Sequence, residues 1–239
     1  MLYSLLCFLF LPSYFMNTRY SNADSSKESV LVIMKTVDFE ITGNGSARNW
    51  EVTNWLSLPQ RKGEIIYQTQ MKLLYSDEGI YCLFKCDDKK ITATLRGDFL
   101  DLYNEDVVEV FFWTDEKVPV YFEYELSPLN YELPILVPNN NGDFFGWRPW
   151  HYEGDRKTRH ETHINKVGSS KDSITFWTAE LFIPFALLKP MSNVPPQKGT
   201  QWRANFYRID YDSGVSNWSW QQTRKNFHDY EKFSTVLFE

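Results

Sequence analysis

Three glutamates of this sequence stand among large apolar residues. Glu109 lies within segment 106–113, and Glu123 and Glu125 lie within segment 119–126. Both segments alternate as half-buried strands do, so successive side chains leave opposite faces. In each strand the valines, phenylalanines and leucine on one face would enter a core, and the glutamates would leave from the other. If the two strands are neighbours, the three carboxylates gather on one face.

Carboxylates beside aromatic rings on a strand face suit a hydroxyl-rich ligand. A sugar ring offers hydroxyl groups to carboxylates, amides and guanidinium groups, and an apolar C–H face to an aromatic ring. Three nearby acids also repel one another. An arginine, a cation or open solvent would compensate, and a solvated outer face without any ligand is the alternative explanation.

Recognisable catalytic motifs are absent from the sequence. It has no Gly-x-Ser-x-Gly elbow and no glycine-rich phosphate loop. His160 and His163 would point to opposite faces of a strand, which disfavours a metal pair. Asp106 and Glu109 would also leave opposite faces, so they could hardly flank one glycosidic bond. The sequence therefore favours binding over catalysis, with no cofactor required.

Two other functions stay open at this level. A glycoside hydrolase, or an accessory domain of one, would use Glu109, Glu123 or Glu125 as its acids. A haem-binding sandwich would need His228 together with Met71 or Met191.

Composition limits the class of protein. The 239 residues are 43% hydrophobic and 17% aromatic, which is enough for a large core and typical of strands. The formal net charge of -6 argues against binding a nucleic-acid backbone. No basic run or basic amphipathic helix suggests a membrane surface.

The N-terminal residues have a different character. Leu2 to Leu11 is almost unbroken apolar sequence, too short to span a bilayer as a helix. Because small residues follow at Ser21 and Ala23, we expect residues 1–23 to be a cleaved signal peptide. The mature protein would then be secreted, periplasmic or at the cell surface, without a membrane span. We expect residues 24–33 to be flexible and residues 34–239 to form one domain.

Short alternating segments separated by turn residues predict an all-β fold. We expect a single antiparallel β-sandwich, immunoglobulin-like or jelly-roll-like, with one short helix whose first turn holds Pro184. The strands are expected at 34–42, 64–76, 79–87, 106–113, 119–126, 131–137, 159–166, 173–183, 200–210 and 233–238.

Two core features follow from the alternation. Cys82 and Cys86 lie four residues apart on one strand, roughly 13 Å, which is too far for a disulfide, so both should be buried free thiols. Arg208 follows Ala204 onto the core face, where an unpaired guanidinium is costly. Asp106 is its expected partner.

The sequence also resembles the family 9 carbohydrate-binding modules over roughly residues 36–239. The order and spacing of several pieces carry the resemblance: Tyr103-x-x-Asp106-x-x-Glu109-Val-Phe, Tyr121-Phe-Glu-Tyr-Glu-Leu-Ser-Pro128-Leu-Asn130, Trp177-x-x-Glu180-Leu-Phe-Ile-Pro184-Phe, Gly199-x-x-Trp202-Arg-x-Asn205-Phe-x-Arg208-x-Asp210, Trp218-Ser-Trp220 and Asn226-Phe-His228-x-x-x-Lys232-Phe.

The resemblance implies a β-sandwich that binds sugars without cleaving them, in support of polysaccharide degradation. Its partners would be a glycan and polysaccharide-degrading enzymes. Some members of the family hold structural calcium, so the resemblance allows a calcium ion without naming its ligands.

In the family, two aromatic residues sandwich a sugar with help from a Glu, an Arg and an Asn. The matching positions here are Tyr103 and Phe227 for the aromatics and Glu109 for the Glu. Tyr and Phe replace two tryptophans, and Glu123 and Arg224 occupy the places of the Arg and the Asn. The expected carbohydrate-binding residues are Tyr103, Glu109, Glu123, Glu125, Arg224, Phe227 and Trp147. Either Trp147 or Trp150 could add a platform, and we expect one of the two to pack in the core.

Overall fold

The computed structural model describes residues 30–140, 143–150, 153–166, 174–189 and 191–239. The expected signal peptide, residues 1–23, lies outside the described residues, as does most of the expected flexible segment. Within the described part of the chain, no helix has the length and apolar character needed to cross a membrane.

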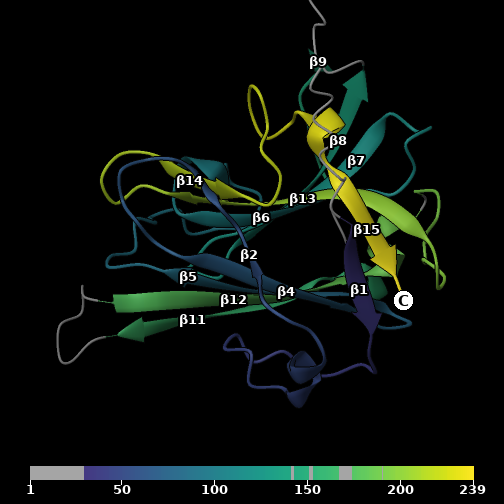
Figure 1. Ribbon diagram of the computed structural model, residues 1–239, viewed down its shortest axis with the longest axis horizontal. Helices are drawn as coiled ribbons and strands as arrows, with labels where there is room; N and C mark the ends of the chain where they lie inside the picture. Colours follow the sequence, from purple (N-terminus) through teal and green to yellow (C-terminus); the bar gives the residue numbers. More distant parts are fainter. Residues whose placement is uncertain (1–29, 141–142, 151–152, 167–173, 190) are drawn as a thin grey trace, which may run out of the picture.

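Two β-sheets pack face to face and form a sandwich, the upper and lower layers of Figure 1. The upper layer, called here the site sheet, has the strand order β10 (Arg148–Pro149), β8 (Glu132–Asn140), β7 (Val120–Leu126), β6 (Val107–Trp113), β13 (Gln201–Asp210) and β15 (Ser234–Phe238). The lower layer, called the opposite sheet, has the order β4 (Thr69–Tyr75), β5 (Gly79–Asp87), β12 (Ile174–Pro184) and β11 (Arg159–Lys166). This arrangement confirms the predicted all-β sandwich.

Shorter elements extend these layers. Strand β14 (Ser216–Ser219) pairs with β13 and with β3 (Gln60–Lys62), β2 (Leu56–Ser57) pairs with β4, and β9 (Asp143–Phe144) pairs with β8. The single α-helix, α1, is Phe185–Leu188, and the 3-10 helices are η1 (Arg48–Val52), η2 (Leu102–Asn104), η3 (Gly154–Arg156) and η4 (Tyr230–Lys232). Pro184 was expected in the first turn of the helix. It is instead the last residue of β12, and α1 begins at the next residue.

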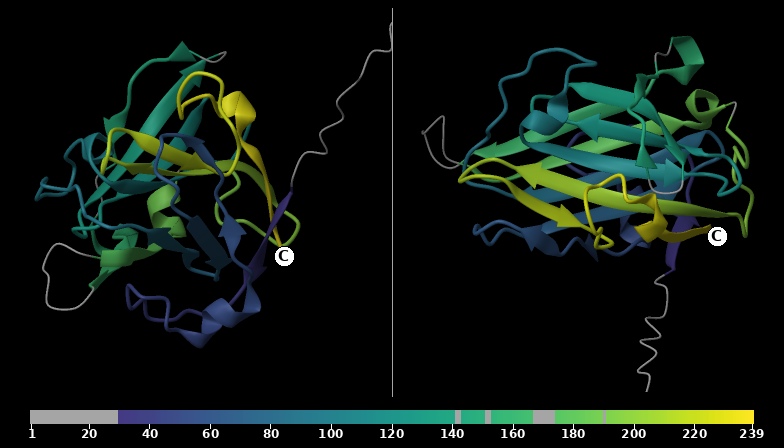
Figure 2. Two further views of the ribbon diagram at one scale, coloured as in Figure 1. Left: turned by 60° about the vertical axis from the view of Figure 1, so that its left-hand side comes forward. Right: turned by 90° about the horizontal axis from the view of Figure 1, so that it is seen from above.

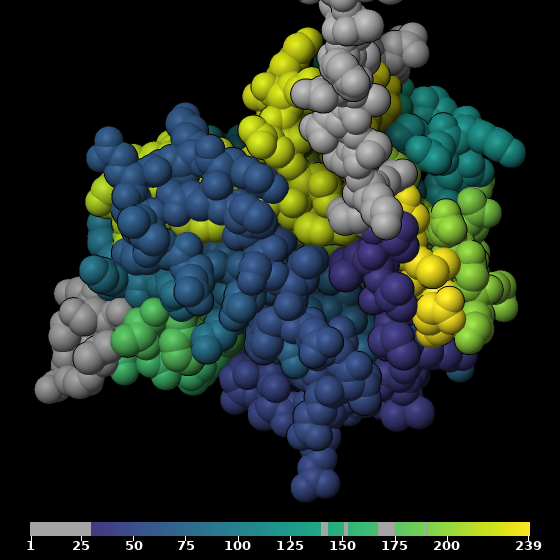
Figure 3. All heavy atoms as spheres, in the orientation of Figure 1, coloured from purple at the N-terminus to yellow at the C-terminus, as the bar shows by residue number. Residues whose placement is uncertain are grey.

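Strand β1 (Leu31–Lys35) joins the two layers. Its first residues pair with β15 and its last two with β4, both in parallel, whereas the other pairs of described strands are antiparallel. Figure 3 shows this segment, in purple, lying against the yellow C-terminal strand. The expected boundary at residue 34 and the expected strand 34–42 are therefore wrong, because the strand begins at Leu31 and the chain leaves the sheet after Lys35.

The core between the sheets is built as the alternation predicts. Val108, Val110 and Phe112 of β6 point into it, and so do the alternate residues of β7. Cys82 and Cys86 of β5 belong to the same core and are free and fully buried, which confirms their predicted state. Burial raises the pKa of the Cys86 thiol to about 12.

A second, smaller core covers the outer face of the site sheet. It combines Phe111 and Tyr121 from the strands with Leu102 of η2 and Tyr230 of η4. The right panel of Figure 2 looks onto this face, where η4 is visible in yellow beside the strands. The face that carries the three glutamates is therefore partly roofed by loops.

Candidate functional site

The pairing of β6 with β7 brings the three glutamates together. Glu109 lies directly opposite Glu125, and Phe111 lies opposite Glu123, in antiparallel register. The predicted gathering of the acids on one face is therefore confirmed. They are not solvated, however, since Glu109, Glu123 and Glu125 are only 2%, 3% and 1% exposed.

A cavity of about 440 Å³ opens above these carboxyl groups. Its walls come from distant parts of the chain. The lining residues are Tyr103, Glu109, Phe111, Glu123, Glu125, Ile135, Phe144, Trp147, Ile209, Asn217, Lys225, Asn226, Phe227 and His228. Six of the residues predicted from sequence are thus brought to one cavity, namely Tyr103, Glu109, Glu123, Glu125, Trp147 and Phe227.

Arg224 is the predicted residue that the structure does not bring to the cavity. Its guanidinium donates hydrogen bonds to the carboxylate of Asp229, at 2.6 and 2.9 Å, and to Glu231. These bonds hold it within its own loop.

Sequence reasoning missed several of the lining residues. Asn226 and His228 flank Phe227 in the C-terminal motif, so that motif held the signal for them. Phe144 lies in the two-residue strand β9, which has no periodicity to reveal it.

The aromatic walls are fixed by their own contacts. The ring of Phe227 stacks on Tyr207 at a centroid distance of 4.0 Å and an interplanar angle of 15°. The Tyr207 hydroxyl donates to the Phe227 carbonyl at 2.9 Å. On the other side, Phe144 stacks on His228 at 4.1 Å, and the Nδ1 atom of His228 is hydrogen-bonded to the Tyr121 hydroxyl at 2.6 Å. Rings held in this way lose little conformational freedom when a planar ligand binds.

Burial dominates the electrostatics of the cavity floor. It raises the pKa of Glu109 to about 8. The pKa values of Glu123 and Glu125 are also raised, by burial first and then by the charge of Glu109. Burial lowers the pKa of His228 to about 4, so this side chain is neutral at pH 7. A neutral imidazole leaves the carboxyl groups without its positive charge.

The two tryptophans considered from sequence have different positions. Trp147 lines the cavity and packs on the outer core. Trp150 packs against the core between the sheets, and its Nε1 atom donates to the Leu187 carbonyl at 2.8 Å. The expectation that one of the pair packs in the core is confirmed for Trp150.

Arg208 lies on the core side of β13, fully buried, as the alternation predicts. Its expected partner was wrong. The guanidinium binds Asp210 at 2.6 Å and Asp88 at 3.2 Å. Asp106 instead accepts hydrogen bonds from the backbone N–H groups of Thr92 and Tyr211. Asp210 points to the same face as Arg208 because it stands two residues further along the strand.

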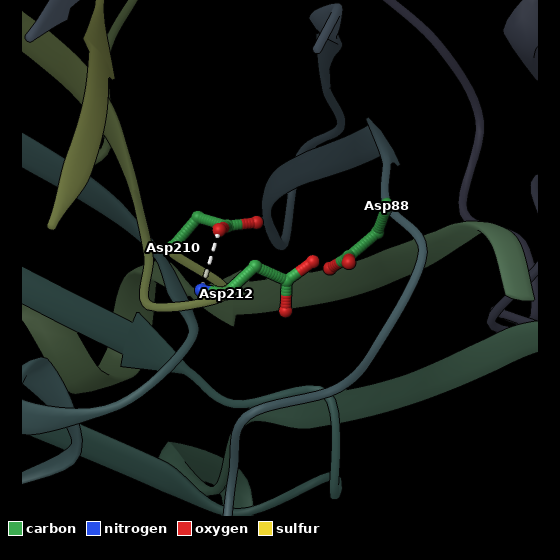
Figure 4. A group of neighbouring side chains, drawn as sticks. All are labelled: Asp88, Asp210 and Asp212. Carbon is green, nitrogen blue, oxygen red and sulfur yellow. Dashed lines mark hydrogen bonds between the residues drawn. The ribbon is translucent and has the colours of Figure 1, made fainter. Parts of the chain in front are cut away.

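Asp88, Asp210 and Asp212 form the group of acids among the described residues that is compact enough to hold a metal ion, with one oxygen from each within 4.8 Å of the others. Figure 4 shows their carboxylates converging from the segment after β5 and the end of β13. Both oxygens of Asp88 and of Asp210 already accept hydrogen bonds, including those from Arg208. The oxygens of Asp212 accept from Tyr67 and Thr92. The guanidinium of Arg208 thus already supplies a positive charge to two of these three aspartates.

The haem ligands considered from sequence are not assembled. Met71 is fully buried in the core between the sheets, and Met191 packs against that core. His228 lies on the outer face of the site sheet. His160 and His163 are not arranged as a metal pair either. His160 is hydrogen-bonded to Asn130 at 2.9 Å, whereas His163 is exposed.

Comparison with known proteins found similarity only at the level of structure. No family model matches the sequence, and no curated protein matches it. A structure from Bacteroides uniformis ATCC 8492, described as a candidate carbohydrate-binding protein, matches with a TM-score of 0.72 and 15% identity. The match covers 89% of this chain and 100% of that one.

Two structures of a family 9 carbohydrate-binding module from Caldicellulosiruptor kristjanssonii are also similar. The complex with cellotriose has a TM-score of 0.63 at 14% identity, covering 88% of this chain and 94% of that one. The complex with glucose has a TM-score of 0.60 at 16% identity, covering 87% and 95%. The resemblance to family 9 modules noted in the sequence is therefore confirmed for the fold.

Proposed function

We propose that this chain binds carbohydrate in the cavity above Glu109, without cleaving it. One observation carries the proposal: residues chosen from sequence as sugar contacts, far apart along the chain, line one cavity. The structural likeness to a family 9 module that was solved with cellotriose and with glucose supports the same function.

The chemistry of the cavity suits a sugar. A volume of about 440 Å³ lies in the usual range for small-molecule sites, roughly 300–1,000 Å³. Tyr103, Phe227 and Trp147 offer faces to the C–H groups of a ring, and the carboxyl groups of the floor offer acceptors to its hydroxyls. Because these contacts come from side chains alone, binding requires no cofactor.

A glycoside hydrolase is the second candidate, and the placement of the acids disfavours it. Glycosidases place two carboxyl groups on either side of the scissile bond. Here Glu109 and Glu125 are cross-strand neighbours, and Glu123 leaves the same face of the sheet, so all three form one floor. An assay of reducing-sugar release from mixed polysaccharides should show no activity above the background, and release that Glu109→Gln abolishes would establish the enzyme.

The biological role proposed here is support of polysaccharide degradation. An apolar segment at Leu2 to Leu11, followed by small residues, supports export to the periplasm, cell surface or medium. Polysaccharide-degrading enzymes are the corresponding partners.

Replacing Tyr103 tests the proposed site. A glycan array on the purified protein identifies the ligand, and calorimetric titration then compares wild type with Tyr103→Ala. Loss of one stacking ring should weaken binding about tenfold, because aromatic stacking and burial contribute on the order of 1–2 kcal/mol. Trp55→Ala is the matched control, since Trp55 is an aromatic residue that is 40% exposed and does not line the cavity.

Two results would contradict the proposal. A glycan array on which the folded protein binds nothing would remove the function. A titration in which Tyr103→Ala binds as tightly as wild type would remove the site.

A further inference from the structure

The floor of the cavity contains oxygen atoms that lack partners. Glu123 Oε2 and Glu125 Oε2 are buried and have no hydrogen-bond partner among the described residues. Both side chains are almost fully buried and line the cavity. A buried carboxyl oxygen without a donor costs free energy, so a ligand that supplies a donor there gains that energy back.

Among the described residues, no lysine or arginine forms an ion pair with the three glutamates of this floor. Nδ1 of His228 lies 3.7 Å from Glu123 Oε2, and it is already hydrogen-bonded to the Tyr121 hydroxyl. Lys225 is exposed at the rim of the cavity, and Arg224 is bound to Asp229 and Glu231.

A single metal ion does not fit the three glutamates. Among the described residues, the one group of three acids with oxygens mutually within 4.8 Å is that of Asp88, Asp210 and Asp212. A cation with several hydrogen-bond donors can instead serve more than one carboxyl group of the floor at once.

An ammonium group on a sugar meets all of these conditions. It offers three donors and a positive charge, and that charge favours the ionised form of buried carboxyl groups whose pKa burial has raised. The hydrogen bonds formed are then of the stronger, charge-assisted kind. The aromatic rings of Tyr103, Phe227 and Trp147 stack on the sugar ring and also attract a cation. A neutral sugar offers only hydroxyl donors and no positive charge, so it does not favour ionisation of the floor.

We propose that the cavity selects carbohydrate carrying a free primary amine, namely 2-amino-2-deoxy sugar units, whose ammonium group binds Glu123 and Glu125. The inference rests on the proposed function and names the class of sugar that the same cavity takes.

Three trisaccharides that share the β-1,4 linkage test the inference. They are fully deacetylated chitotriose, its tri-N-acetylated form and cellotriose, which differ only in the amine, acetamide or hydroxyl group at carbon 2. Calorimetric titration at neutral pH and low salt should show the deacetylated trimer binding at least about tenfold tighter than the other two. Added salt should reduce that preference.

Two variants locate the preference in the floor. Glu123→Gln and Glu125→Gln each remove one ionisable carboxyl group while conserving shape, and each should reduce the preference for the amine trimer over cellotriose about tenfold. Their folding is checked by melting temperature, and two variants are used so that failure of one to fold leaves the other. Glu78→Gln, in an exposed turn, is the control for loss of one negative charge.

The possible failures are distinguishable. Equal or tighter binding of cellotriose would overturn the inference and leave carbohydrate binding intact, as would a preference that survives both substitutions. Failure of all three trimers together with a silent glycan array would overturn both proposals. Spermidine binding as tightly as the amine trimer would mean a cation site without sugar recognition, which overturns both as well.

Discussion

A carboxyl group buried beside two others resists ionisation, and Glu109 is such a group. Its usual pKa of 4.5 applies to the unfolded chain, and burial raises it to about 8 in the fold. Below pH 4.5 both states hold the proton, so the group contributes nothing to stability. Between the two pKa values the unfolded chain releases its proton and the fold keeps it, so stability falls as pH rises. Above pH 8 the full cost remains.

Glu109→Gln should therefore raise the free energy of unfolding, and with it the melting temperature, by an amount that depends on pH. The gain in free energy over wild type should be small near pH 4.5, grow up to about pH 8 and then level off at a value on the order of a few kcal/mol. Calorimetric melting across this range measures it, with Glu78→Gln as the control for charge. Because the three acids titrate together, the midpoint belongs to the set. A gain that stays constant over the whole range would show that Glu109 keeps its ordinary pKa in the fold.

Alternation predicts the face on which a residue lies and not the partner it meets there. It placed Glu109 on the outer face and Arg208 in the core, and both placements are confirmed. It could not choose among the acids near Arg208, because Asp88 comes from the segment after β5 and reaches it only through sheet packing. Partners of this kind depend on the tertiary structure.

Glu180 of β12 organises the irregular segment that follows β1. Its Oε2 atom accepts hydrogen bonds from the backbone N–H groups of Thr42 and Gly43, both at 2.8 Å, and Oε1 accepts one from Trp50 Nε1 at 2.8 Å. Gly45 also donates to Oε2, with a positive φ of 69°, and an added Cβ there would meet Leu83 at 2.5 Å. The loop therefore needs both its glycines and this one carboxylate.

Glu180→Gln should destabilise the fold, because the NH₂ group of the glutamine would face N–H groups of the loop, so donors would meet donors. We expect a loss of about 1.5–3 kcal/mol, the usual range for hydrogen bonds to a charged group. Denaturant unfolding measures it, and hydrogen exchange should show faster amide exchange at residues 42–50. Glu161→Gln, on the neighbouring strand and exposed, should change stability by less than about 0.5 kcal/mol. Unchanged exchange in the loop of the Glu180 variant would mean that the carboxylate does not hold the loop.

Long strands were predictable from sequence and short ones were not. Strands such as β5 and β12 have enough residues to display their period, whereas β2, β3, β9, β10 and β14 have two to four. Segment 34–42 looked like a strand because Phe39 and Ile41 alternate with polar residues. In the structure these two side chains pack beside Trp50 without joining a sheet.

At the scale of the whole molecule, the sandwich is predictable and the cavity is only half predictable. The floor comes from two neighbouring strands, whose pattern shows in the sequence. The walls come from η2, β9 and the segment around Phe227, which approach one another only when the chain is folded. The resemblance to a family supplied Tyr103 and Phe227, and nothing local in the sequence marked Phe144.

The two sheets meet along β1, so the molecule should unfold as one unit. Ile33 is fully buried in the core between the sheets and pairs with Phe238 of β15, and the next residue, Met34, pairs with Leu74 of β4. Loss of packing at this point should weaken both layers together, as expected for a single cooperative domain.

Ile33→Ala should lower the free energy of unfolding by about 2–5 kcal/mol, the usual range for a buried isoleucine truncated to alanine. Scanning calorimetry should still show one transition, shifted to lower temperature. Val32→Ala is the matched control, since Val32 is the neighbouring strand residue but is 43% exposed, and its truncation should cost far less. Two separate transitions in the Ile33 variant would show that the sheets hold together independently of β1. A shift no larger than that of Val32→Ala would mean that the packing of β1 against β15 contributes little to the fold.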